Sequence, residues 1–172
     1  VHGGDRKVLP HVGPRSLLHW VIPFASTNMR KRPLYSLVSY AFHICLLATP
    51  LFLMGHAVLW QESWGVRWWS LPDSIADIMT LIVIGACTIF IIRRLVRPEV
   101  RNVSYGSDFL LALVVMAPFL TGYLAQHQWL PYRLAIIVHI VSGALFLLVI
   151  PWTRLVHMIW FAFTRSYMGS EF

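Results

Sequence analysis

Four long apolar segments constrain the fold of this 172-residue chain more than any other feature of its sequence. A helix needs about 20 residues to cross the hydrocarbon core of a bilayer. The segments meet that length and run over residues 35–60, 74–92, 107–125 and 132–163. Inside lipid, every backbone polar group must find its partner within the protein, so each segment is expected to be helical. The sequence therefore predicts an all-α integral membrane protein, a bundle of four transmembrane helices.

These segments divide the chain into three regions. Residues 1–34 contain one short apolar patch, residues 16–25, which cannot span a bilayer and predicts a cytoplasmic or interfacial N-terminal segment. Residues 35–163 form the predicted four-helix transmembrane domain, and residues 164–172 form a cytoplasmic C-terminal tail. The fourth segment is longer than a membrane requires, so it is expected to protrude, tilt or bend at Pro151.

Basic residues gather on one side of the predicted bundle. Only 12% of the residues are charged, about half the fraction usual in a soluble domain. An even number of spans places both termini and the connection between the second and third spans on one face, and that face has twelve of the 14 Lys and Arg residues. The positive-inside rule therefore predicts a multi-pass membrane protein with both termini in the cytoplasm. Nucleic acid is not an expected partner, because the basic residues lie at helix ends and form no folded basic face. The twelve are Arg6, Lys7, Arg15, Arg30, Lys31, Arg32, Arg93, Arg94, Arg97, Arg101, Arg154 and Arg165, and the opposite face has Arg67 and Arg133.

Four histidines lie inside the first and fourth segments, where an ionisable side chain is costly and usually functional. They are His43 and His56 in the first segment and His139 and His157 in the fourth. The interiors of these segments contain no Asp, Glu or Lys that could pair with them, so a metal is the expected partner. The remaining histidines are expected to be solvated: His2, His11, His19 and His127.

The spacing of these histidines pairs them by depth. On a continuous helix, His139 and His157 are five turns apart, so both rings would project from one face at a separation of roughly 27 Å. His43 and His56 are roughly 20 Å apart, and they share a face only if Pro50 between them alters the helical phase. Because the two segments are antiparallel, His43 matches His157 in depth and His56 matches His139. Two levels of paired imidazoles predict two haems b, with iron bound by His43 and His157 in the inner haem and by His56 and His139 in the outer haem.

Three neighbouring residues are candidates for contact with the haems. Gly55 adjoins a ligand histidine and Gly143 follows one by a turn, and a porphyrin needs such gaps in a helix surface. Glycine is equally common in plain packing between membrane helices. Arg154 lies near the cytoplasmic interface, where its guanidinium is expected to bind either a haem propionate or a lipid headgroup.

Two blocks of sequence are similar to those of a known family. One comprises HIVSG at 139–143 and PWTRLVH at 151–157, and the other RRLVRPEVR at 93–101 and GSD at 106–108. FHI at 42–44 and GH at 55–56 look like that family's first ligand helix. Over about residues 40–160, the chain resembles the cytochrome b (gamma) subunit of respiratory nitrate reductase and its relatives that occur beside heterodisulfide-reductase-like subunits.

The resemblance implies an electron carrier of a prokaryotic inner membrane, with the two haems paired as above. Electrons would pass between a quinone pool, or another membrane or periplasmic redox subunit, and an iron–sulfur subunit docked on the basic cytoplasmic face. Menaquinone is thus an additional candidate cofactor, although the family's quinol-binding lysine falls on Ala76 here. The groups left for quinol are His56, Asp73 and Asp77, and Asp73 could equally cap its helix.

No catalytic residues are assigned, because a chain this small without a catalytic constellation is expected to be a subunit and not an independent enzyme. Two alternatives come from other functional classes. One is a haem-free membrane anchor that only recruits soluble subunits. The other is a small transporter with a histidine proton relay, which the lack of intramembrane carboxylates beside the histidines disfavours.

Overall fold

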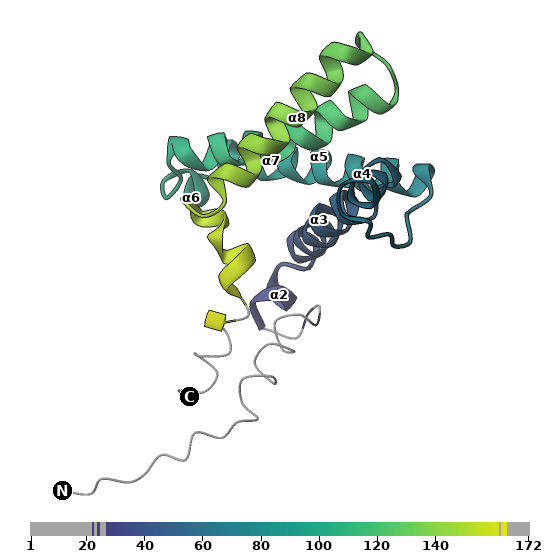
Figure 1. The fold of residues 1–172 in the computed structure, drawn as a ribbon. Helices are drawn as coiled ribbons and strands as arrows, with labels where there is room; N and C mark the ends of the chain where they lie inside the picture. Colours follow the sequence, from purple (N-terminus) through teal and green to yellow (C-terminus); the bar gives the residue numbers. More distant parts are fainter. Residues whose placement is uncertain (1–21, 23, 25–26, 162, 165–172) are drawn as a thin grey trace, which may run out of the picture. The chain divides into compact units, whose positions relative to one another are not determined.

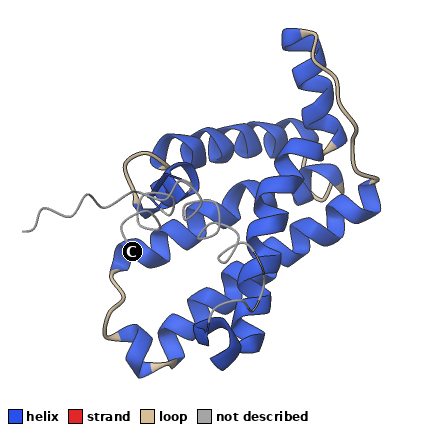
Figure 2. Cartoon of the chain, turned by 90° about the horizontal axis from the view of Figure 1, so that it is seen from below, coloured by secondary structure: helices blue, strands red, loops and turns tan. Residues whose placement is uncertain are grey.

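A computed structural model describes residues 22, 24, 27–161 and 163–164 of the chain. Every regular element among these residues is helical, with no strand (Figures 1 and 2), so the all-α prediction is confirmed. Most of the predicted N-terminal segment 1–34 and nearly all of the tail 164–172 lie outside the described residues. The helices are α2 (Thr27–Lys31), α3 (Pro33–Phe52), α4 (Met54–Trp64), α5 (Asp73–Val96), α6 (Pro98–Arg101), α7 (Gly106–Gln126) and α8 (Tyr132–Val149), followed by a 3₁₀ turn (Arg154–Val156).

Four of these helices, α3, α5, α7 and α8, are long and apolar enough to cross a membrane. The predicted second and third spans agree with α5 and α7 to within a few residues. The first predicted span, 35–60, is wrong as a single helix, because Leu53 is extended (φ −66°, ψ 133°) and separates α3 from α4. The fourth predicted span, 132–163, is wrong as a single helix, because α8 ends at Val149 and helical backbone resumes only after the 3₁₀ turn. The interruption lies at Pro151, the predicted point of a bend, since proline disfavours helical backbone in the residue before it and cannot donate an N–H bond.

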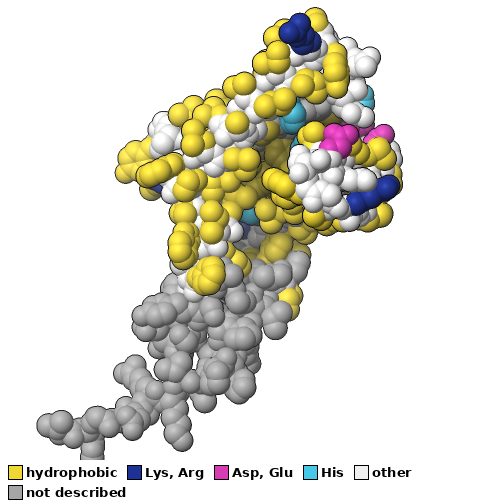
Figure 3. All heavy atoms as spheres, viewed as in Figure 1, with side chains coloured by type: hydrophobic (Ala, Val, Ile, Leu, Met, Phe, Trp, Pro, Cys, Tyr) yellow, Lys and Arg dark blue, Asp and Glu magenta, His cyan; other side chains and the backbone are white. Residues whose placement is uncertain are grey.

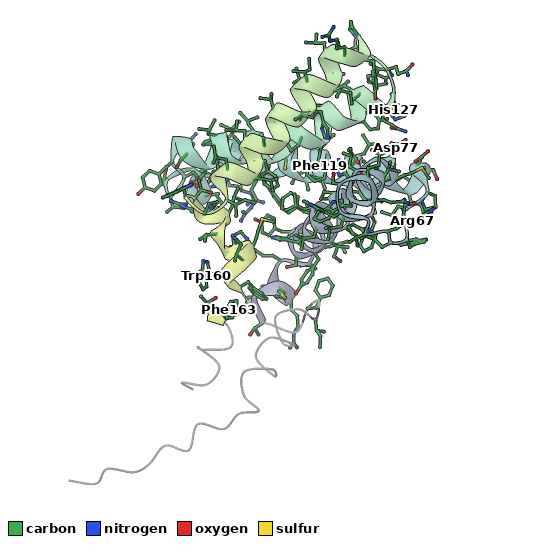
Figure 4. All side chains as sticks on the ribbon, viewed as in Figure 1. Arg67, Asp77, Phe119, His127, Trp160 and Phe163 are labelled. Carbon is green, nitrogen blue, oxygen red and sulfur yellow. The ribbon has the colours of Figure 1, made fainter. Side chains whose placement is uncertain are left out.

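Backbone contacts divide the chain into two units, residues 38–148 and residues 1–37 with 149–172. Within the first unit, α5 packs against α7 and α6. Small residues form a row along the core-facing side of α5. They are spaced three or four positions apart, as expected for one face of a packed membrane helix. Phe119 of α7, labelled in Figure 4, is buried as well. The row on α5 comprises Ala76, Thr80, Val83, Ala86 and Cys87.

Both ends of the α5–α7 pair are fastened by polar side chains. Arg94, near the end of α5, lies 3.3 Å from the carboxylate of Asp108 in the first turn of α7. That carboxylate also accepts the backbone N–H of Tyr105 at 3.0 Å and so caps α7. At the opposite end, Asp77 of α5 lies 3.1 Å from Nε2 of His127 after α7, and Figure 4 labels both residues. The two helices are therefore antiparallel, as alternating spans require.

Two minor expectations at that end are wrong. Asp73 does not cap α5; the N-cap is Pro72, and Asp73 is the first helical residue, where its charge favours the helix dipole. His127 is more than a solvated loop residue, because its ring contacts Asp77 and lies 4.3 Å from the ring of Tyr123.

Hydrophobic side chains cover most of the visible described surface, and charged ones are sparse (Figure 3). Only 6% of the apolar window of α8 is buried, with Leu147 and Leu148 about two-thirds exposed. A soluble monomer rarely exposes so large an apolar area. This surface is consistent with a multi-pass membrane protein whose helices contact lipid or other subunits.

Candidate functional site

The imidazoles of His56 and His139 face each other within the unit 38–148. His56 lies in the first turn of α4 and His139 lies midway along α8. Their ring centroids are 5.9 Å apart and their ring planes differ by only 19°. Two histidines 83 positions apart in sequence thus form one pair, as the depth argument predicted for these two residues.

Only His43 and His139 lie in helices long enough to span a membrane, but each of the four candidate histidines has its Nδ1 atom against a backbone carbonyl oxygen. For His56 the acceptor is Pro50 at 2.8 Å, and for His139 it is Pro118 at 3.0 Å. A carbonyl oxygen only accepts, so Nδ1 donates the proton, and in the neutral imidazole Nε2 then has the lone pair. This arrangement is usual for histidines that bind metals, because it fixes the tautomer and the ring orientation. The other two contacts join His43 to Ser39 at 2.7 Å and His157 to Arg154 at 2.6 Å.

The end of α3 positions His56. The last four carbonyls of a helix have no partner inside it, and a membrane offers no water to satisfy them. Here each receives a donor from the chain that follows, so the break at Leu53 leaves no open carbonyl and turns α4 so that His56 contacts α3. The donors to Thr49, Pro50, Leu51 and Phe52 are, in order, the Leu53 N–H (2.9 Å), His56 Nδ1–H (2.8 Å), Trp68 Nε1–H (2.8 Å) and Leu71 N–H (2.7 Å).

A glycine of α7 makes room for His139. A β-carbon on Gly122 would lie 3.0 Å from Cε1 and 3.2 Å from Nδ1 of that ring. Thr121 Oγ1 lies 3.4 Å from the same Nδ1 and 3.1 Å from the hydroxyl of Ser142 on α8. The sequence analysis missed these residues and Trp68. The small-residue pair Thr121–Gly122 within an apolar span was the available signal.

The two histidines of the predicted inner pair belong to different units of the chain. His43 belongs to the unit 38–148, where its ring lies 5.1 Å from that of Phe42, and His157 belongs to the other unit. Their pairing stays a prediction. The reasoning from a continuous helix is wrong, however, because α8 ends between His139 and His157 and α3 ends between His43 and His56.

The roles predicted for the remaining candidate residues stay predictions. A β-carbon on Gly55 or Gly143 would meet nothing within 4 Å, so both positions are open as a porphyrin edge would require. Arg154 is the first residue of the 3₁₀ turn, and its backbone carbonyl accepts the Nδ1–H of His157. Ala76 is buried in the row that faces the α5–α7 core. Asp77, a candidate for quinol, is bound to His127.

The His56–His139 pair matches two axial ligands of one haem iron in residue type and in the distance between ring centres. Among the described residues, no group of three or more His, Cys, Asp or Glu could hold a metal ion, but a haem takes only two axial ligands from the protein. With a metal–imidazole bond of roughly 2 Å and each ring centre about 1 Å farther out, two rings on opposite sides of one iron have centroids roughly 6 Å apart. The observed separation is 5.9 Å. In the neutral rings, an Nδ1–H donor leaves the Nε2 lone pair for iron.

Comparisons with known proteins identify one relative by sequence. No protein-family profile matches the chain, and no solved structure matches it. A protein of the bacterium Nitratidesulfovibrio vulgaris (strain Hildenborough) is 35% identical over 158 residues, which cover 92% of this chain and 70% of that protein. Its name, "Protein", states no activity.

Proposed function

The chain belongs to the same family as that Nitratidesulfovibrio vulgaris protein, and from this premise we propose that it is a dihaem cytochrome b subunit of a respiratory oxidoreductase in a prokaryotic inner membrane. In this role it carries electrons between a quinone pool or periplasmic redox partner and a cytoplasmic iron–sulfur subunit. The family supplies no activity, so the proposal depends on the chain's own residues.

The observation that carries the proposal is the His56–His139 pair. Two imidazoles from helices distant in sequence have near-parallel planes and a ring-centre separation that matches two ligands of one iron, and both Nδ1 atoms lie against carbonyls. A haem-free anchor has no need for such a pair. A proton relay is less well supported, because the Nδ1–H groups of all four candidate histidines donate to backbone carbonyls, which cannot pass a proton on.

The chain's residues would hold two haems at different depths. His56 and His139 would bind the outer one, His43 and His157 would bind the inner one, and Arg154 would supply a cation for a propionate. When bound, each haem iron supplies a one-electron couple, and two imidazoles per iron leave no position for oxygen, which suits electron transfer.

The docking surface for the iron–sulfur subunit is the basic connection after α5. Arg97 and Arg101 are exposed there, whereas Arg94 is bound to Asp108. Exposed arginines of one sign attract an acidic partner and raise its association rate.

The test is a reduced-minus-oxidised absorption spectrum of the purified chain, with haem and protein quantified separately. The proposal predicts two haems b per chain. A well-folded preparation that contains no haem refutes it.

A further inference from the structure

The face of α7 toward His139 is shaped by a missing side chain. The β-carbon that alanine would add at Gly122 lies at 3.0 Å from Cε1 of the imidazole. At the other helical glycines of the described chain, the same β-carbon meets nothing within 4 Å: Gly55, Gly85, Gly106 and Gly143. Gly122 therefore allows the ring to lie directly against the helix, and any larger residue must move the ring or the helix.

Hydrogen bonds fix one edge of the same ring. Nδ1–H donates to the Pro118 carbonyl at 3.0 Å, and Thr121 Oγ1 is a second acceptor at 3.4 Å. The Thr121 hydroxyl has one proton, and the carbonyl one turn back takes it at 2.8 Å. Its oxygen can then accept from the imidazole. The Ser142 hydroxyl lies 3.1 Å from that oxygen, and it donates its own proton to the His139 carbonyl at 2.9 Å. The ring thus has two acceptors at Nδ1 and a glycine beside its Cε1 atom, all three on α7.

We propose that Gly122 and Thr121, supported by Ser142, are positioning residues that set the orientation and donor strength of His139 and thereby the ligand field of the outer haem. The inference rests on the proposed function and adds residues to it. An acceptor on Nδ1–H makes an imidazole a stronger ligand. A stronger ligand stabilises ferric over ferrous iron and lowers the reduction potential, so removing an acceptor raises it.

The experiment compares two variants with two matched controls. Gly122→Ala adds the β-carbon against the ring, and Gly85→Ala adds one to a spanning helix where nothing lies within 4 Å. Thr121→Val removes the hydroxyl acceptor. Thr88→Val removes a hydroxyl that bonds only the carbonyl one turn back, at 2.9 Å. For each protein the haem content, the low-spin electron paramagnetic resonance spectrum and a redox titration are measured.

All five proteins, wild type included, are expected to contain two haems. In Gly122→Ala, one of the two low-spin signals shifts, because the ring must move by a few tenths of an ångström. In Thr121→Val, the midpoint potential of one haem rises while the other stays constant. Both controls match the wild type.

The inference is overturned if both signals and both potentials are unchanged in the two variants, or if the controls shift equally. Thr121→Val is nearly isosteric, so its spectrum and redox titration test the inference even if Gly122→Ala does not fold. Wild-type protein without haem refutes the proposed function itself, and that result is distinct from two haems with unperturbed spectra.

Discussion

Replacement of His139 by alanine separates haem ligation from structural stability. The substitution removes one of two proposed axial ligands of the outer haem, so the haem content should fall from two per chain to one. The loss of folding free energy is small compared with the total stability of a typical protein. Pro118 and Thr121 lose a hydrogen-bond partner, which amounts to about 1 kcal/mol against a typical total stability of roughly 5–15 kcal/mol. The variant should therefore fold and be purified with the inner haem in place.

His127→Ala is the matched control for this experiment. His127 also lies in the unit 38–148, and its ring is bound to Asp77 at 3.1 Å with both side chains about one-third exposed. Loss of such an exposed pair costs roughly 0.2–1 kcal/mol, similar to the structural cost at His139. The assay is haem per chain from the pyridine haemochromogen spectrum and an independent protein determination. Two haems in His139→Ala, or a loss of haem in His127→Ala as well, would refute the assigned ligand.

Two further predictions concern the structure that holds the site. Asp108→Ala removes the α7 cap and the partner of Arg94, which should lower the free energy of unfolding by about 2 kcal/mol or more. In thermal unfolding in detergent, it should lower the melting temperature more than Asp77→Ala does at the exposed end of the same helix pair. Equal shifts of the melting temperature would contradict the burial argument. Trp68→Phe keeps an aromatic ring but removes the donor to the Leu51 carbonyl, which costs about 0.5–1.5 kcal/mol. Limited proteolysis should then cut residues 65–72 faster than in wild type, and an unchanged rate would mean that this bond does not fasten the segment.

The sequence predicts the membrane helices best where charge bounds an apolar run. Helix α5 lies between Asp73 and the arginines that follow residue 92, and its bounds were predicted to within a few residues. Hydropathy does not report helix breaks, however. It continues through Leu53 and past Pro151, so the first and fourth spans were predicted too long. Proline marked both regions, but the break at Leu53 depends on donors from Trp68 and Leu71, which no local pattern shows.

The candidate site was predictable only in part, because contacts between helices also leave no local pattern in the sequence. His56 and His139 are conspicuous as ionisable residues in apolar segments, and their pairing followed from antiparallel depth. Gly122 matters only because α8 places an imidazole against it. Similarly, the contact of Asp77 with His127 joins residues far apart in sequence. Contacts between helices of this kind arise from tertiary packing and have no periodic signature.

The most direct test of the central claim, that two imidazoles fill both axial positions of each iron, is exposure of the dithionite-reduced wild-type chain to carbon monoxide. Bis-histidine ligation leaves no open position. The reduced spectrum should therefore stay unchanged, and the oxidised protein should show two low-spin ferric haems per chain in electron paramagnetic resonance. Rapid formation of a carbon monoxide complex by one haem per chain, with a matching high-spin ferric signal, would contradict the claim.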